Sequence, residues 1–155
     1  VSPEQDYHLS INSLCQHARG DWICLFNDQS CMVTLHWDDL LLRMIDEGWN
    51  QCVSVCIAIM TNVNCAWDQR FFFIRREVFN LLGHLSKHPY VHNWLCNVLA
   101  MVNSVVRVPM FEISGDVPML WNEPLSVEDK LQLAKDQIQD VLVLLDHIEK
   151  DQLCN

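Results

Sequence analysis

Glycine and proline are scarce in this sequence, with 4 glycines and 5 prolines among 155 residues, and no regular rhythm of strands and turns is visible. This scarcity favours an all-α fold. Basic residues are scarce as well: 10 Lys and Arg stand against 20 Asp and Glu, giving a net charge of −10. Since nucleic-acid binding depends on clustered cations, we expect no direct nucleic-acid binding by this domain. No uncharged apolar run reaches about 18 residues, so no membrane span is expected.

The residues that are present are typical of one folded domain spanning 1–155. Half are apolar and 19% are charged, which excludes a disordered chain. The first residues lack the basic start and apolar block of a signal peptide. Because the chain begins at Val1 rather than Met, we expect a piece of a longer protein.

Cysteine is plentiful, and its eight copies would permit disulfides. Five of them stand within apolar stretches, where a free cysteine behaves as a small hydrophobic residue. A helical domain of this size needs no covalent cross-links, so the sequence predicts an intracellular reducing compartment. These five are Cys15, Cys24, Cys52, Cys56 and Cys96.

The segment Asp68–Arg107 reads as two antiparallel helices joined by a tight turn. Asp68 is a good N-cap, and Pro89 fits the first position of the second helix because no N–H donor is needed there. Apolar residues recur three and four apart on both sides of the turn. The segment is therefore predicted to be an αα-hairpin at the centre of the fold.

Other segments extend this helical pattern. Helices are predicted from Ser2 to Gly20, from about Cys31 to Glu47, and over 51–64. The β-branched residues of 51–64 also permit a buried strand, but no partner strand is evident, so we expect a helix. The sequence as a whole predicts an irregular antiparallel array of helices, resembling a HEAT-like α-solenoid without a fixed repeat.

The end of the chain combines an apolar loop, 108–125, with a long helix, 126–153. The loop either packs back over the helices or serves as a docking strap for a partner. The helix carries an apolar heptad seam, which either packs on its own domain or extends to another chain. The seam residues are Val127, Leu131, Ala134, Ile138, Val141, Leu145 and Ile148.

One cluster could carry chemistry. His84, His88, His92 and Cys96 stand four apart, but Pro89 interrupts the series, so we expect no metal site and no cofactor. No cysteine lies in a glycine-rich turn, and the serine-hydrolase, phosphate-loop and zinc-protease motifs are missing. We therefore expect no catalytic residues. A metal- or thiol-dependent enzyme using His88, His92 and Cys96 is the alternative.

A basic and aromatic patch stands out against the acidic background. Arg70, Arg75 and Arg76 surround Phe71–Phe73, and Arg and aromatic residues are favoured as interface anchors. The competing interpretation is that these arginines only cover the solvent face of their helix.

Part of the sequence resembles the C-terminal helical region of the ATR-interacting protein (ATRIP) family, regulatory partners of the ATR checkpoint kinase. The resemblance lies in MVTLHWDDLL, then RFFFIRREVFNLLGHLSKH, then WLCNVLAMVNSVVRVPMFEISGD, and is greatest over 70–116. It implies a non-catalytic HEAT-like subunit, nuclear, that binds the helical repeats of the kinase in DNA-damage signalling.

We therefore expect a scaffold or regulatory domain that binds a larger helical-repeat protein, by resemblance an ATR-like kinase. A domain that assembles with its own copies through the heptad seam is the second possibility. The expected partner-binding residues are Phe111, Trp121, Leu131, Ile138, Val141, Leu145, Ile148, Arg70, Arg75 and Arg76.

Overall fold

The computed structural model describes residues 7–26, 30–46, 57–62, 72–88, 91–114 and 125–154. The five strands within them build one sheet, in the order β1-β4-β3-β5-β2. The fold is therefore mixed α/β, and the predicted all-α, HEAT-like array is wrong. The elements are α1 (Tyr7–His17), β1 (Trp22–Cys24), β2 (Cys31–Met32), α2 (Trp37–Asp46), β3 (Ile57–Asn62), β4 (Phe72–Arg75), α3 (Arg76–Leu82), α4 (Val91–Met101), β5 (Val105–Ser114) and α5 (Val127–Cys154).

Four strands replace structure that the sequence pattern predicts differently. The pattern predicts a helix over 31–32, 57–62, 72–75 and 105–107, and an apolar loop over 108–114, where the chain forms β2, β3, β4 and β5. The longer strands β3, β4 and β5 are rich in β-branched or aromatic residues, and all four strands have their partners elsewhere in the sequence. A short apolar run fits a helix or a strand equally well by pattern, so long-range pairing decides between them.

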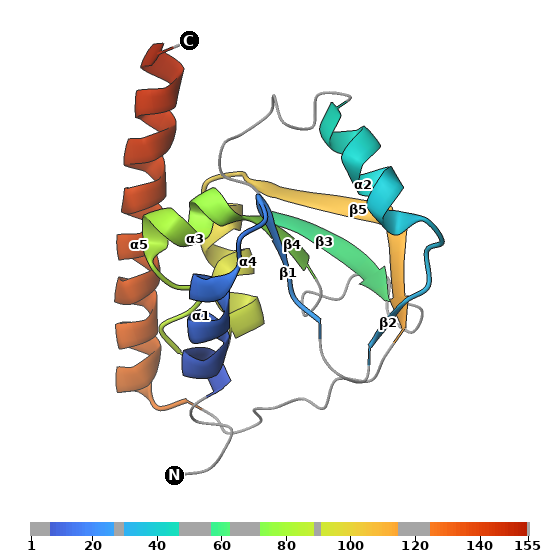
Figure 1. Ribbon diagram of the computed structural model, residues 1–155. Coiled ribbons are helices and arrows are strands. Elements are labelled where there is room, and N and C mark those ends of the chain that lie inside the picture. Colours follow the sequence, from blue (N-terminus) through green and yellow to red (C-terminus); the bar gives the residue numbers. More distant parts are fainter. Residues whose placement is uncertain are drawn as a thin grey trace.

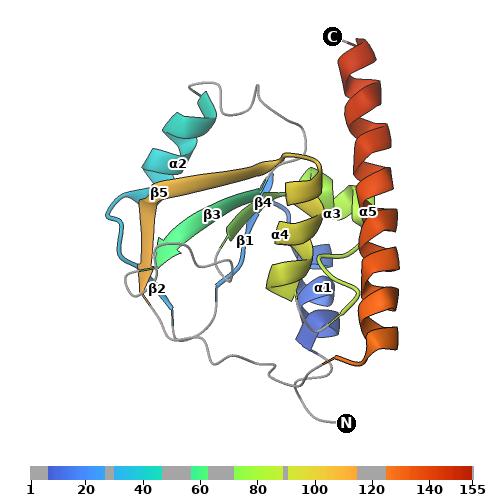
Figure 2. The ribbon, with the colours of Figure 1, turned by 180° about the vertical axis from the view of Figure 1, so that it is seen from behind.

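Both faces of the sheet are covered. The side chains of β4 alternate, and all three of its aromatic and aliphatic residues are buried: Phe72 and Ile74 join a core cluster with α1, α3, α4 and α5, while Phe73 joins a second cluster with α2. Figures 1 and 2 show α1, α3 and α4 lying between the strands and α5. Because β4 is buried on both sides, its sequence is continuously apolar rather than alternating.

β5 is the longest strand and bends along its length (Figure 1). It runs parallel to β3, and the pairing jumps from Met60–Val108 to Thr61–Glu112. The extra residues in β5 include Pro109, which has no N–H to donate to a neighbouring strand, so a bulge is expected there. Beyond the bulge β5 turns to pair with β2.

The turn between α3 and α4 is held against α1. Gly83 ends α3 with a φ of 74°, a left-handed conformation that glycine adopts at no steric cost. The Asn12 side chain of α1 then accepts a hydrogen bond from the backbone N–H of Leu85 at 2.8 Å and donates one to the carbonyl of Ser86 at 2.8 Å. These bonds fix residues 84–88, of which His84, Lys87 and His88 face carboxylates of α5.

Candidate functional site

α5 lies at the edge of the fold (Figures 1 and 2), and its two faces differ. Its inner face contacts α3 and α4. That face combines a fully buried Leu144 with two nearly buried polar residues, Gln137 and Asp140. Leu133, Val141 and Ile148 pack beside them against the core.

The outer face of α5 carries large apolar side chains that remain exposed. Of the predicted heptad residues, Leu131 and Ile138 are 57% and 54% exposed, and Leu145 is 39% exposed. Only Val141 and Ile148 pack against the core cluster. Most residues of the heptad seam therefore point outward, and only Val141 and Ile148, at one edge of the seam, contact the domain. We define the outer stripe as Val127, Leu131, Ile138, Leu142 and Leu145.

Asp140 is the centre of a buried polar network on the inner face. Its carboxylate accepts hydrogen bonds from Lys87 Nζ at 2.9 Å and from Trp94 Nε1 at 2.8 Å, and it lies 3.4 Å from His84 Nε2. Burial alone would raise the pKa of Asp140, but the contacts with His84, Lys87 and Trp94 outweigh it and lower the pKa below its ordinary value. The network therefore keeps Asp140 charged inside the fold.

His88, in the turn between α3 and α4, extends this network to a second carboxylate of α5. Its Nε2 atom lies 3.3 Å from Asp136 Oδ2, and its ring stacks on buried Trp94 with centroids 5.1 Å apart. Two of the four histidine and cysteine residues spaced four apart, His84 and His88, therefore face carboxylates of α5. The side chain of His92 lies outside the described part.

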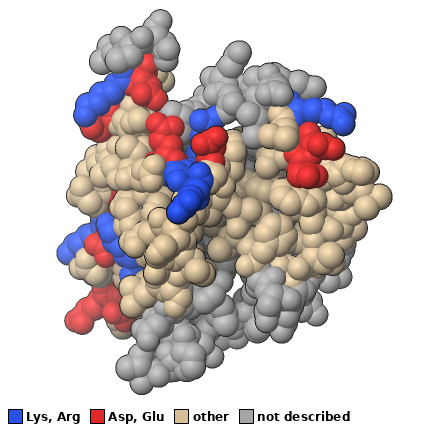
Figure 3. All heavy atoms as spheres, viewed as in Figure 1, with Lys and Arg blue, Asp and Glu red and all other residues tan. Residues whose placement is uncertain are grey.

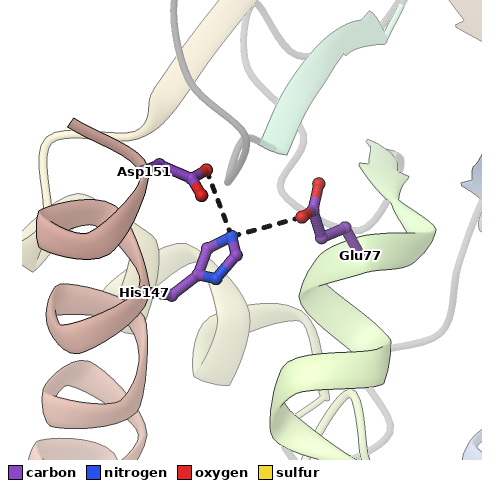
Figure 4. A group of neighbouring side chains, drawn as sticks. All are labelled: Glu77, His147 and Asp151. Carbon is purple, nitrogen blue, oxygen red and sulfur yellow. Dashed lines mark ion pairs between the residues drawn. The ribbon is translucent and has the colours of Figure 1, made fainter. Parts of the chain in front are cut away.

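A third polar group joins α3 to the last turns of α5. His147 Nε2 lies 3.2 Å from Glu77 Oε1 and 3.4 Å from Asp151 Oδ2 (Figure 4). His147 and Asp151 stand four apart on α5, and Glu77 belongs to the first turn of α3. Sequence reasoning missed this triad. Histidine and aspartate at this spacing were the only signal available, because Glu77 is seventy positions away along the chain.

The cysteines whose side chains the structure describes are free thiols, and three of them are shielded from solvent. Cys15, Cys24, Cys31 and Cys96 form no disulfide. Burial raises the pKa of Cys15 to about 11 and that of Cys96 to about 12. Only the thiolate is nucleophilic, so the arrangement around Cys96 does not support a thiol-dependent enzyme.

The other predicted partner-binding residues have structural roles or lie outside the described residues. Phe111 is fully buried in β5, where it packs edge to face against Phe73, so it cannot anchor a partner. Arg75 lies over the ring of Trp22 at 5.3 Å, and Arg76 Nε donates to the carbonyl oxygen of Gly20 at 2.7 Å. Both arginines thus brace the α1–β1 connection against β4. Arg70 and Trp121 fall outside the described part of the chain.

No protein-family model matches this chain, and no curated protein or solved structure matches it. None of the helices in the described residues is long and apolar enough to cross a membrane. The expected HEAT-like architecture is wrong here as well, because a five-stranded sheet is incompatible with an all-helical repeat.

Proposed function

We propose that this chain is a non-catalytic interaction domain that binds an amphipathic helix of a partner protein along the outer stripe of α5. The observation that supports this proposal is the exposure of five large apolar side chains on one helix face. From Val127 to Leu145 the stripe is about 27 Å long at the standard helical rise. A contiguous apolar surface of this kind on a soluble domain is typical of a binding site.

The charge of the chain favours a basic partner over a second copy. The net charge is −10, so two copies would repel each other, whereas a partner with basic flanks would be attracted. Figure 3 shows charged side chains of both signs along α5, with uncharged surface between them. We therefore expect an amphipathic helix with leucine-like residues on one face and Lys or Arg beside them. No comparison tests the resemblance to the ATR-interacting protein family. An ATR-like kinase as the partner and a nuclear localisation therefore remain predictions.

The test uses a tagged full-length chain that carries a photo-crosslinking amino acid at Ile138 in one version and at Gln139 in the other. The version that carries the crosslinker at Ile138 should capture, in cells, a partner peptide that mass spectrometry identifies as an amphipathic helix rich in Lys and Arg. The version that carries it at Gln139 should give a weaker yield of the same peptide. Ile138→Asp and Leu145→Asp should remove this partner, and Gln139→Asp should retain it.

Two outcomes would overturn the proposal. Equal crosslinking in all variants would show that the stripe is not the contact. Crosslinks only to the chain itself, with a sedimenting dimer that Ile138→Asp converts to monomer, would show self-assembly instead.

A further inference from the structure

We infer that Glu77, His147 and Asp151 form a binding site for a divalent transition metal, with Zn²⁺ as its best-matched occupant, which joins α3 to the end of α5. The inference is independent of partner binding, because the triad and the outer stripe occupy different faces of α5.

The donor set fits such an ion. The three side chains offer one imidazole nitrogen and two carboxylate oxygens, and these atoms all lie within 4.8 Å of one another. Imidazole with carboxylates suits Zn²⁺ and its neighbours in the first transition row, whereas Ca²⁺ and Mg²⁺ prefer oxygen alone. Three protein ligands with water at the fourth position are a common coordination of Zn²⁺.

The spacing of the atoms also fits. His147 Nε2 lies 3.2 Å from Glu77 Oε1 and 3.4 Å from Asp151 Oδ2 (Figure 4). In a tetrahedral zinc site with bonds of about 2.0–2.1 Å, neighbouring ligand atoms lie about 3.3 Å apart. The Glu77 side chain is 42% exposed, so its carboxylate can rotate toward the other two ligands without disturbing the core.

The second observation concerns His147 Nε2 itself. This atom is buried from solvent and makes no hydrogen bond of acceptable geometry, although two carboxylate oxygens lie beside it. A buried polar atom without a partner is costly. A divalent cation placed between this nitrogen and the two carboxylates would satisfy all three groups together.

The site would connect distant parts of the chain. Glu77 lies in the first turn of α3, directly after β4, and the other two ligands lie in the last two turns of α5. A bound ion would hold the C-terminal end of α5 against α3. Since the ion binds the folded chain only, it should raise the midpoint of thermal unfolding as its concentration rises.

The experiment titrates Zn²⁺ into the reduced full-length chain after removal of metal by a chelator, using calorimetry and thermal unfolding. We expect one equivalent bound and a higher melting midpoint. His147→Gln, Glu77→Gln and Asp151→Asn should each weaken binding by at least about tenfold, the smaller of the effects known for changes around zinc sites. Asp146→Asn is the matched control, because Asp146 lies on the same helix but pairs with Lys150 at the surface.

Cysteine side chains are the main competitors for Zn²⁺. The absorption spectrum of bound Co²⁺ distinguishes a cysteine site from the triad of Glu77, His147 and Asp151. Co²⁺ bound by nitrogen and oxygen should show weak visible bands without the intense thiolate absorption of cysteine sites.

Zinc binding that persists unchanged in the three triad variants would overturn the inference by placing the ion elsewhere. No binding to the parent chain would also overturn it and leave an ion-pair cluster only. Glu77→Gln and Asp151→Asn change partly exposed side chains, so the test does not depend on the folding of His147→Gln.

Discussion

The inner and outer faces of α5 both depart from the usual distribution of polarity, because the inner face holds charged residues and the outer face holds large apolar ones. The inner face, packed on α3 and α4, carries Asp136, Asp140, His147 and Asp151 beside its apolar residues. The outer face carries the stripe of Leu131, Ile138 and their neighbours. A surface helix normally places its apolar side inward and its charges outward. The inward-facing Asp136, Asp140 and His147 each meet a partner on α3, on α4 or in the turn between these helices.

These contacts bear on the rotation of α5 about its own axis. Part of the apolar heptad seam, including Leu131 and Ile138, faces away from the domain. The observed rotation instead brings Asp140 to Trp94 and Lys87, and His147 to Glu77. Buried polar contacts of this kind select one register among several that hydrophobic burial would permit. The predictions that follow test this comparison, beginning with the largest expected effect.

A matched pair of leucines compares the two faces directly. Leu144 is fully buried and Leu142 is 54% exposed on the same helix. Leu144→Ala should lower the free energy of unfolding by about 2–5 kcal/mol, because it leaves a cavity in the core. Leu142→Ala should lower it by less than about 1 kcal/mol, because less area returns to water. Urea unfolding of both variants checks this, and equal losses would mean that the outer face is also packed.

The next largest effect on the free energy of unfolding should come from the polar network around Asp140. Asp140→Asn removes the charge but keeps the shape of the side chain, and it leaves the contacts of Lys87 and Trp94 weakened. We expect a loss of about 1–3 kcal/mol in the free energy of unfolding. Lys87→Met should cost only about 0–1 kcal/mol, since the Lys87 side chain is 38% exposed and solvent screens its charge. A double-mutant cycle measures the coupling, and a larger effect from Lys87 than from Asp140 would contradict a network centred on the carboxylate.

Acid should weaken the inner face selectively. The pKa of Asp140 in the folded chain lies below its ordinary value of 3.8, so the unfolded chain takes up this proton first. The stabilisation is then complete above pH 3.8 and is lost as the pH falls through the lowered pKa. Unfolding measured from pH 6 to pH 2.5 should show a steeper loss for the parent chain than for Asp140→Asn. Parallel curves would mean that other carboxylates dominate acid unfolding.

The sequence predicted helices best where local signals were complete. Ser126 and Asp129 indicated the start of the last helix, and Ser126 Oγ does accept a hydrogen bond from the Asp129 N–H, at 3.0 Å. The helical pattern around Pro89 corresponds in its middle to α3 and α4, whereas both ends of the predicted hairpin form strands. The sheet was missed because β3 and β5 pair across more than forty residues, and their apolar runs carry no local mark of that partnership.

The candidate sites depended on the same long-range information. Apolar periodicity identified the outward residues Leu131, Ile138 and Leu145 but could not tell which side of the helix faced the core. The triad of Glu77, His147 and Asp151 was out of reach for a different reason. Its ligands come from helices that meet only in the folded chain, and no motif marks them.

The smallest expected effect on stability is also the most informative about the outer stripe. Ile138 is 54% exposed, and an aspartate at this position would remain in contact with water. Ile138→Asp should therefore change the free energy of unfolding by no more than about 0.5 kcal/mol, the usual range for surface substitutions. Thermal and urea unfolding, with Gln139→Asp as the reference for an added charge on α5, measure this difference. A loss of several kcal/mol would place Ile138 in the core and remove the basis for an exposed stripe. A negligible loss, by contrast, means that nothing within this domain requires an isoleucine there, so that the side chain is available for the proposed partner contact.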